Sequence, residues 1–299
     1  MLAPAPPFQL RQVRDFSQLV SGGFAFLRRH GRPLYRAILI CCVPPMLLVT
    51  YLLGGALDAL FGSRTFGSEA DHSGYLALGA YVLGLLVALL LHAMIHEFFR
   101  LYDQGQDAST GLLLRRAVRM SLHYLGILAL TALMLAGAVF LCALVFALEE
   151  PVLNVVAVLG MIAAVLAVLT MCSLASAAQA LEAKGVATAM GRSWSLVRNQ
   201  FWSTLGLGVV VGLIVLTLTY AVQFIASMLM FVIVALGVSM QGQASAVPIL
   251  MALILALMFC MLLIAYPVPC ACMMLKFCSR AEEEEGHGLR ERVAGFGEL

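Results

Sequence analysis

The residues with the clearest capacity for chemistry lie in the run LLHAMIHEFFRLY, at residues 90–102. His92 and His96 are four positions apart, so on a helix they share one face, where two imidazoles can bind one metal ion. His123 begins a later apolar segment and is a candidate third ligand. The order HxxxHE differs from the HExxH of zinc proteases, where the glutamate lies between the histidines. The three histidines therefore define a candidate metal or haem site without a protease motif.

A second interpretation of the same run needs no metal. Polar side chains within apolar helices often make hydrogen bonds to neighbouring helices. Glu97 can then pair with Arg100, three positions further along the same helix. No cofactor motif accompanies the histidines, and we predict no cofactor. This structural interpretation is the favoured one.

Prolines interrupt two further apolar segments, at CCVPP (41–45) and YPVPCAC (266–272). Interrupted helices at matching depth in a membrane often form the binding site of a transporter. The lining of such a cavity would include Pro44, Pro45, Tyr266, Pro267 and Pro269. Prolines are also tolerated in spanning helices, where neighbouring groups satisfy the freed backbone. The segments lack the buried carboxylates expected of a proton- or sodium-coupled carrier, so transport is the second choice of function.

All of these residues belong to a chain of 299 residues that is 62% hydrophobic and only 11% charged. Soluble domains contain about 25% charged residues, so a soluble enzyme is excluded. A helix of roughly 20 apolar residues crosses a bilayer core. Six stretches qualify: approximately 34–61, 75–99, 123–148, 151–178, 201–238 and 247–276. The fifth stretch contains no charge, and we expect one long span there rather than two.

Positive charges mark one side of the predicted membrane domain. Of the 18 Lys and Arg residues, all except Arg64 precede or enter the first span or follow an even-numbered span. Because excess Lys and Arg mark the cytoplasmic face, we expect both termini in the cytoplasm. The prolines of MLAPAPPFQL occupy the place of a signal peptide's apolar region, so no cleaved export signal is expected. The net charge of +2 gives no reason to expect a nucleic-acid partner.

A basic, amphipathic segment precedes each odd-numbered span, at residues 15–34, 110–128 and 187–205. Such helices lie in the membrane plane, with their arginines toward lipid phosphates. Trp194 and Trp202 lie where an interfacial aromatic belt would place them. The candidate head-group contacts are Arg28, Arg29, Arg115, Arg116, Arg119, Arg192 and Arg198. The alternative is that these arginines only set the orientation of the chain.

The ends of the even-numbered spans also match, since each has an acidic residue shortly before a glycine: LYDQGQ (101–106), LEAKGV (181–186) and EEEEGHGL (282–289). A left-handed glycine commonly ends a helix. The predicted fold is therefore all-α, with six transmembrane helices in three repeats of an amphipathic in-plane helix plus a transmembrane hairpin. The domain boundaries are a single membrane domain at 1–281, repeat units at about 11–106, 107–185 and 186–281, and a charged tail at 282–299.

The pattern GRSWSLVRNQFWSTLGL at 191–207 resembles the membrane domain of some glycerophosphoryl diester phosphodiesterases and of many uncharacterised bacterial six-span proteins. The opening residues 14–39 and the closing residues 282–299 are similar to one branch of those proteins. The resemblance implies a six-span fold in a bacterial inner membrane. Enzymes of that family keep catalysis in a separate soluble domain. No part of this chain resembles that domain, so no enzymatic activity is expected.

The function predicted from the sequence is a non-enzymatic inner-membrane scaffold or accessory subunit that organises lipids or partner proteins. Its partners would be membrane lipids, together with another membrane protein or further copies of this chain. The first alternative is a transporter or lipid-handling protein that uses the proline-broken cavity. The second is an intramembrane metal or haem protein that uses His92, His96 and His123. None of the eight cysteines lies in a predicted outer loop, so no disulfide framework is expected.

Overall fold

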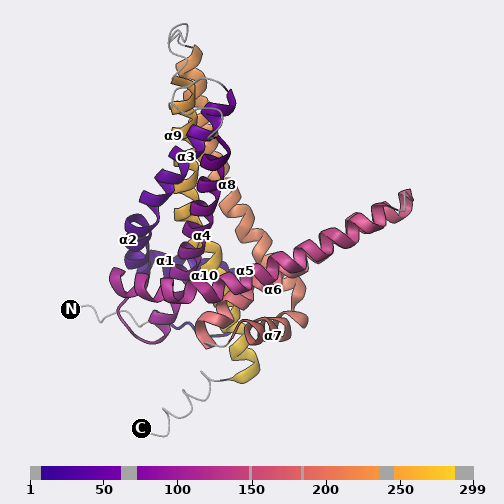
Figure 1. The fold of residues 1–299 in the computed structure, drawn as a ribbon. Helices are drawn as coiled ribbons and strands as arrows, with labels where there is room; N and C mark the ends of the chain where they lie inside the picture. The colour runs from indigo at the N-terminus through magenta and orange to yellow at the C-terminus, as the bar shows by residue number, and fades with distance from the viewer. Residues whose placement is uncertain (1–7, 62–72, 148–149, 183–184, 236–245, 287–299) are drawn as a thin grey trace, which may run out of the picture.

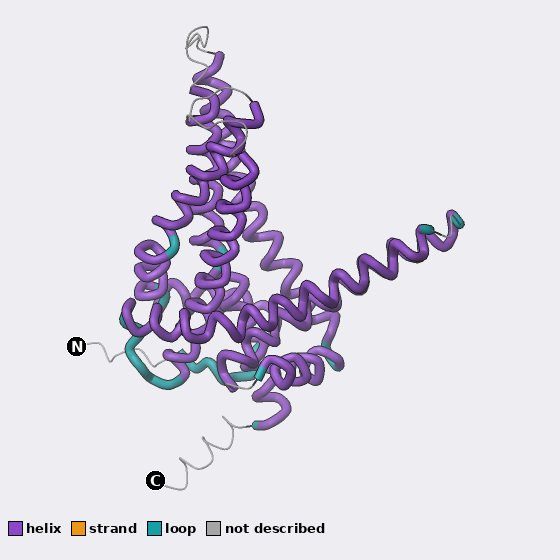
Figure 2. The backbone as a smooth tube through the Cα atoms, in the orientation of Figure 1, coloured by secondary structure: helices purple, strands orange, loops and turns teal. Residues whose placement is uncertain are grey.

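The computed structural model describes residues 8–61, 73–147, 150–182, 185–235 and 246–286. Within these residues the chain forms α-helices and no strand (Figures 1 and 2). The helices are α1 (Phe16–His30), α2 (Arg32–Cys41), α3 (Val43–Phe61), α4 (Ser73–Asp103), α5 (Thr110–Phe146), α6 (Pro151–Glu182), α7 (Val186–Arg198), α8 (Phe201–Ala235), α9 (Ala246–Ala265) and α10 (Pro267–Glu285). The predicted all-α class is confirmed for the described part of the chain.

Among the residues that the structure describes, six segments are long and apolar enough to cross a membrane, in agreement with the predicted number of spans. They are Arg32–Ala56, Gly74–Asp103, Thr110–Phe146, Val152–Glu182, Phe201–Met228 and Ile254–Glu284. The fifth belongs to one uninterrupted helix, α8, as its lack of charge predicts. The chain is therefore a multi-pass membrane protein.

The prolines interrupt the first and last spans where the sequence places them. Helix α2 ends at Cys41 and α3 begins at Val43, directly before Pro44 and Pro45. In the last span, Tyr266 separates α9 from α10, which has Pro267 in its first turn. Proline is tolerated in the first turn of a helix because its missing N–H has no partner there.

Two glycine turns after even-numbered spans are confirmed, and the third differs. Gly105 follows α4 with φ 64° and Gly286 follows α10 with φ 61°, so both adopt the left-handed conformation that ends a helix. Gly185 has φ −63° and instead precedes the first residue of α7. The second turn therefore starts the next helix rather than ending the previous one by a left-handed residue.

Separate short helices form in two of the three segments for which the sequence predicts an amphipathic in-plane helix. The first is α1, which has a capping box between Asp15 and Gln18, and the third is α7. The prediction of a separate helix at 110–128 is wrong, because these residues continue into the span as one helix, α5. Pro33 opens α2 directly after α1, whereas residues 110–146 contain no proline to interrupt the backbone hydrogen bonds.

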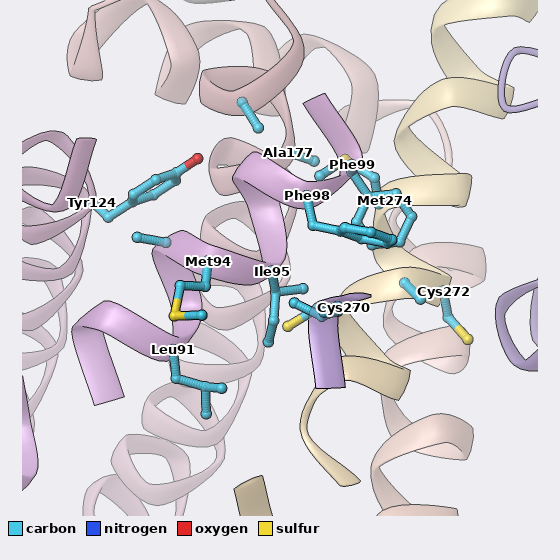
Figure 3. Close-up of a cluster of buried hydrophobic side chains, with 14 of the residues drawn as sticks. Leu91, Met94, Ile95, Phe98, Phe99, Tyr124, Ala177, Cys270, Cys272 and Met274 are labelled. Atoms are coloured by element: carbon cyan, nitrogen blue, oxygen red, sulfur yellow. The ribbon is translucent and has the colours of Figure 1, made fainter. Parts of the chain in front are cut away.

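The buried core lies at one end of the molecule, which we call the arginine-rich end. Residues of α1, α2, α4, α5, α6, α7 and α10 contribute to it. Figure 3 shows the part that lies between α4, α6 and α10. Phe26 of α1 is fully buried and stacks on Phe99 of α4, with ring centroids 4.8 Å apart. Ala177 of α6 and Met274 of α10 complete the same cluster. Helices from the N-terminal and the C-terminal parts of the chain therefore pack together at the arginine-rich end.

Helices α5 and α6 run side by side away from the other spans, at a wide angle to α3, α4 and α9 (Figure 1). Their far halves present exposed apolar side chains, among them Leu133, Phe140 and Val155. Such surface is stable only against lipid tails or another apolar surface. The hairpin is therefore anchored at the arginine-rich end and presents an apolar surface beyond it.

Candidate functional site

Three arginines meet in a pocket of about 440 Å³ between the end of α4 and the start of α5. We call it the arginine pocket; its lining is Glu97, Arg100, Gln104, Arg116, Arg119, Met120 and His123. The left-handed Gly105 turns the chain after α4. The Ser109 hydroxyl then accepts a hydrogen bond from Leu112 N at 3.4 Å and starts α5. This short connection places the basic residues of both helices face to face.

Arg116 is held in the arginine pocket by two uncharged acceptors. Its Nη1 donates to Gln104 Oε1 at 3.1 Å, and its Nη2 donates to Gln106 Oε1 at 2.8 Å. Amide oxygens fix the orientation of a guanidinium without neutralising its charge. Arg116 is therefore positioned in advance and still able to attract an anion.

Glu97 is the one carboxylate that lines the arginine pocket. It is completely buried, and its Oε1 lies 3.6 Å from Arg100 Nη1, as the sequence predicts for this pair. Neither Glu97 oxygen accepts a hydrogen bond within the described residues. Three arginines against one carboxylate leave an excess of positive charge. The chemistry fits a phosphate group, which guanidinium groups bind through paired hydrogen bonds.

His92 and His96 face the interior from α4, with their ring centroids 4.2 Å apart. His92 Nδ1 lies 2.9 Å from Tyr266 Oη, and its Nε2 lies 3.0 Å from Ser176 Oγ. His96 Nδ1 donates to the His92 carbonyl oxygen at 2.8 Å. His92 thus joins α4, α6 and the break between α9 and α10. This is the polar contact between helices that the second interpretation predicts.

His123 is not part of this cluster. It is exposed and lines the arginine pocket, whereas its neighbour Tyr124 packs on His92 and His96 at centroid distances of 5.4 and 5.5 Å. Successive residues on a helix point about 100° apart, so only one of the two can face α4's histidines. Among the described residues no three His, Cys, Asp or Glu side chains are arranged to hold a metal. The predicted three-histidine site is therefore wrong in its third ligand.

Ser176, His92 and Tyr266 form a chain of hydrogen bonds that superficially resembles an activated serine. Ser176 is buried, and it lines none of the cavities described here. Its oxygen also lies 3.3 Å from the carbonyl of Cys172, to which it donates. The arrangement supports a structural role for Ser176.

The predictions from the sequence do not place Tyr124 and Ser176 in this cluster. Tyr124 has a buried hydroxyl with no hydrogen bond in the described part of the chain, and its position beside His123 gives no separate signal. Ser176 belongs to the run SLASAA at 173–178, and small residues of this kind indicate close contact between spanning helices. This run therefore indicates that Ser176 lies at a contact between helices.

The other predicted head-group arginines differ in their surroundings. Arg29, Arg115 and Arg198 are exposed, and Arg28 lies at the edge of a separate cavity of about 410 Å³ lined mainly by apolar side chains. Arg192 instead pairs with Glu182 and with Glu284, each at 3.2 Å. It joins α6, α7 and α10, so it is not a lipid contact in this arrangement.

The residues around the proline breaks are only partly brought together. A cavity of about 660 Å³ lies between α3, α4 and α9, and its lining includes Met46, Phe259 and Tyr266. Pro269 lines a different pocket, together with His92 and His96. Pro44, Pro45 and Pro267 line neither of these cavities. The prolines interrupt the helices, and the space beside the breaks is lined by their neighbours.

The segment before α1 is fixed to the arginine-rich end. Arg11 pairs with Asp103 at 3.0 Å, and Arg14 N donates to Ser279 Oγ at 3.0 Å. Arg14 also lies over the Phe8 ring, 5.1 Å from its centroid, and burial lowers the pKa of its guanidinium. Burial, and then the charge of Arg29, lower the pKa of His30. These contacts hold the start of the chain against α4 and α10.

Comparisons with known proteins add no relative. No family model, no curated protein and no solved structure matches the chain.

Proposed function

We propose that this chain is a non-enzymatic membrane protein that binds anionic phospholipid head groups on its cytoplasmic side and organises the lipids around it. The observation that supports this most directly is the arginine pocket, where Arg100, Arg116 and Arg119 outnumber the single carboxylate. Arg116 is already oriented by Gln104 and Gln106. A basic pocket between spans is a recognised form of lipid head-group site.

The proposal includes the finer features expected from the sequence. The arginine-rich end would face the cytoplasm, because Lys and Arg accumulate on that side of membrane proteins. The membrane would be a bacterial inner membrane, in keeping with the resemblance to bacterial six-span proteins. The three units of helix and hairpin would be repeats, of which the second has fused its amphipathic helix to the span. A scaffold role for partner proteins would use the exposed apolar hairpin of α5 and α6.

The test is a titration of the purified full-length chain with phosphatidylglycerol and phosphatidylcholine, followed by native mass spectrometry. Each arginine near a lipid phosphate contributes on the order of 1 kcal/mol, so Arg116→Gln with Arg119→Gln should weaken phosphatidylglycerol binding about 30-fold. Arg115→Gln is the matched control, since Arg115 is on the same helix and does not line the pocket. Equal loss in the control, or equal binding of the two lipids by the wild type, refutes the proposal.

A second candidate function is lipid handling, for which the cavity between α3, α4 and α9 is the supporting observation. Its described lining is almost entirely apolar and has the size of a lipid-chain site. Lipid exchange between leaflets of proteoliposomes, measured with a fluorescent lipid and a quencher, tests this function. Gly84→Leu narrows the cavity and should slow the exchange. No exchange by the wild type, or the same rate in the variant, rules this candidate out.

A further inference from the structure

A second polar pocket lies deeper along the spans, away from the arginines. It has a volume of about 360 Å³ and lies between α4, α6, α8 and α10. Its polar lining consists of His92, His96, Thr170, Ser173, Thr204 and Tyr266. None of the residues described as lining it is charged. We call it the neutral pocket.

The serine and threonine hydroxyls of the neutral pocket donate to backbone carbonyls of their own segments, whereas the Tyr266 hydroxyl contacts His92. Thr170 Oγ1 donates to Leu166 O at 2.6 Å, and Ser173 Oγ donates to Thr170 O at 2.7 Å. Thr204 Oγ1 donates to Gln200 O at 3.1 Å. A hydroxyl that has used its hydrogen still has lone pairs and can accept. The pocket wall therefore presents acceptors from α6 and α8.

His96 adds a further acceptor. Its Nδ1 donates to the His92 carbonyl at 2.8 Å, so in the neutral ring Nε2 has the lone pair. His96 is 3% exposed, and Nε2 makes no hydrogen bond within the described residues. A donor that enters the neutral pocket can therefore form a hydrogen bond with Nε2, which would stabilise its binding.

The neutral pocket opens beside exposed apolar side chains. Leu169 of α6 and Val209 of α8 line it and are 51% and 47% exposed. Helix α6 runs away from the other spans beyond this point (Figure 1). The pocket thus combines apolar walls, a lateral opening between α6 and α8, and acceptors that lack donors.

We propose that the neutral pocket binds an uncharged lipid through a free hydroxyl group, such as that of a diacylglycerol. A hydroxyl supplies the hydrogen that His96, Thr170 and Thr204 can accept. The lack of charge in the described lining excludes a phosphate or carboxylate, because a charged group would be left unpaired in a low-dielectric site. The apolar rim on α6 and α8 fits the acyl chains. This site is separate from the arginine pocket and does not depend on the proposed function.

The experiment compares two probes that differ only at the hydroxyl: 1,2-dioctanoylglycerol and the same molecule with that hydroxyl acetylated. Each is titrated into the full-length protein in detergent, and bound probe is counted by native mass spectrometry. With one hydrogen bond at stake, from the probe's hydroxyl to an acceptor of the pocket, the wild type should prefer the free alcohol by up to about tenfold. Thr170→Val with Thr204→Val keeps the side-chain shape and removes two of the acceptors, so this preference should fall.

Two further variants distinguish the loss of the binding preference from a loss of folding. Thr219→Val is the matched control, because Thr219 lies on α8 and donates to Val215 O in the same way, outside the neutral pocket. It should retain the wild-type preference. His96→Asn keeps a donor for the His92 carbonyl and removes Nε2, so it should reduce the preference without loss of the thermal transition. If the wild type binds both probes equally, or if the preference persists in both pocket variants, the proposal is overturned.

Discussion

Gly23 is the point of closest approach between α1 and α10, and its replacement gives a sharp test of the packing at the arginine-rich end. A Cβ at this position would lie 2.5 Å from Cys272 Sγ and 3.3 Å from the Cys272 backbone nitrogen. The first contact is too short for any side chain, and the second involves backbone that cannot rotate away. Gly23→Ala must therefore push α1 off α10.

The adjacent glycine supplies the control. A Cβ at Gly22 would meet Leu275 Cδ1 at 3.4 Å, which is an ordinary contact. Both substitutions gain up to about 1 kcal/mol from better helix propensity. Overpacking costs Gly23→Ala about 1–3 kcal/mol. We therefore expect Gly22→Ala to be neutral or stabilising, and Gly23→Ala to be less stable than Gly22→Ala by about 1–3 kcal/mol.

Denaturant titration of the detergent-solubilised chain, followed by tryptophan fluorescence and circular dichroism, measures the difference. Cys272→Ala removes the nearest atom, Sγ, and should recover part of the loss when combined with Gly23→Ala. The backbone nitrogen at 3.3 Å remains, so recovery should be incomplete. Equal stability of the two alanine variants would show that α1 does not pack against α10 as described.

Three further predictions concern polar contacts. Tyr266→Phe removes the hydroxyl 2.9 Å from His92 Nδ1 and should lower the free energy of unfolding by about 1–3 kcal/mol. Unchanged stability would mean that another group replaces this hydroxyl as the hydrogen-bond partner of His92. Arg192→Gln breaks the pairs with α6 and α10 and should cost about 1 kcal/mol in thermal or denaturant unfolding, more than Arg198→Gln at an exposed position. The lowered pKa of His30 means that the neutral ring favours the folded state, so stability should be lost as pH falls below about 6.5. His30→Gln should make that loss smaller between pH 7.5 and 5.5, and an identical pH dependence would contradict the assignment.

The number of spans and the helix breaks were predictable from the sequence, because each depends on local properties. Apolar length decides whether a helix can cross a membrane, and proline decides where the backbone ladder is interrupted. The chain from Phe201 to Ala235 forms one helix for the same reason, since no charge or proline interrupts it.

What could not be predicted depends on how one helix is rotated against another. The spacing of His92 and His96 fixes their common face on α4, but nothing in the sequence shows that Tyr124 rather than His123 faces them from α5. Arg192 likewise has a partner, Glu284, that is far away in the chain. Partners distant in sequence become visible only when the helices are packed.

The two pockets lie on different faces of α4, and they differ in the charge of their linings. Glu97 lines the arginine pocket, and the preceding residue, His96, lines the neutral pocket, as their different directions on the helix require. Charged side chains are stable where water and phosphates reach them, near a membrane surface, and the sequence predicts the arginines there. Deeper in the span, where charge is costly, the side chains are neutral acceptors whose hydrogens are already used. A phospholipid head group suits the first environment and an uncharged hydroxyl the second. Under the two proposals, the chain would distinguish the two lipid classes by the charge of each pocket's lining.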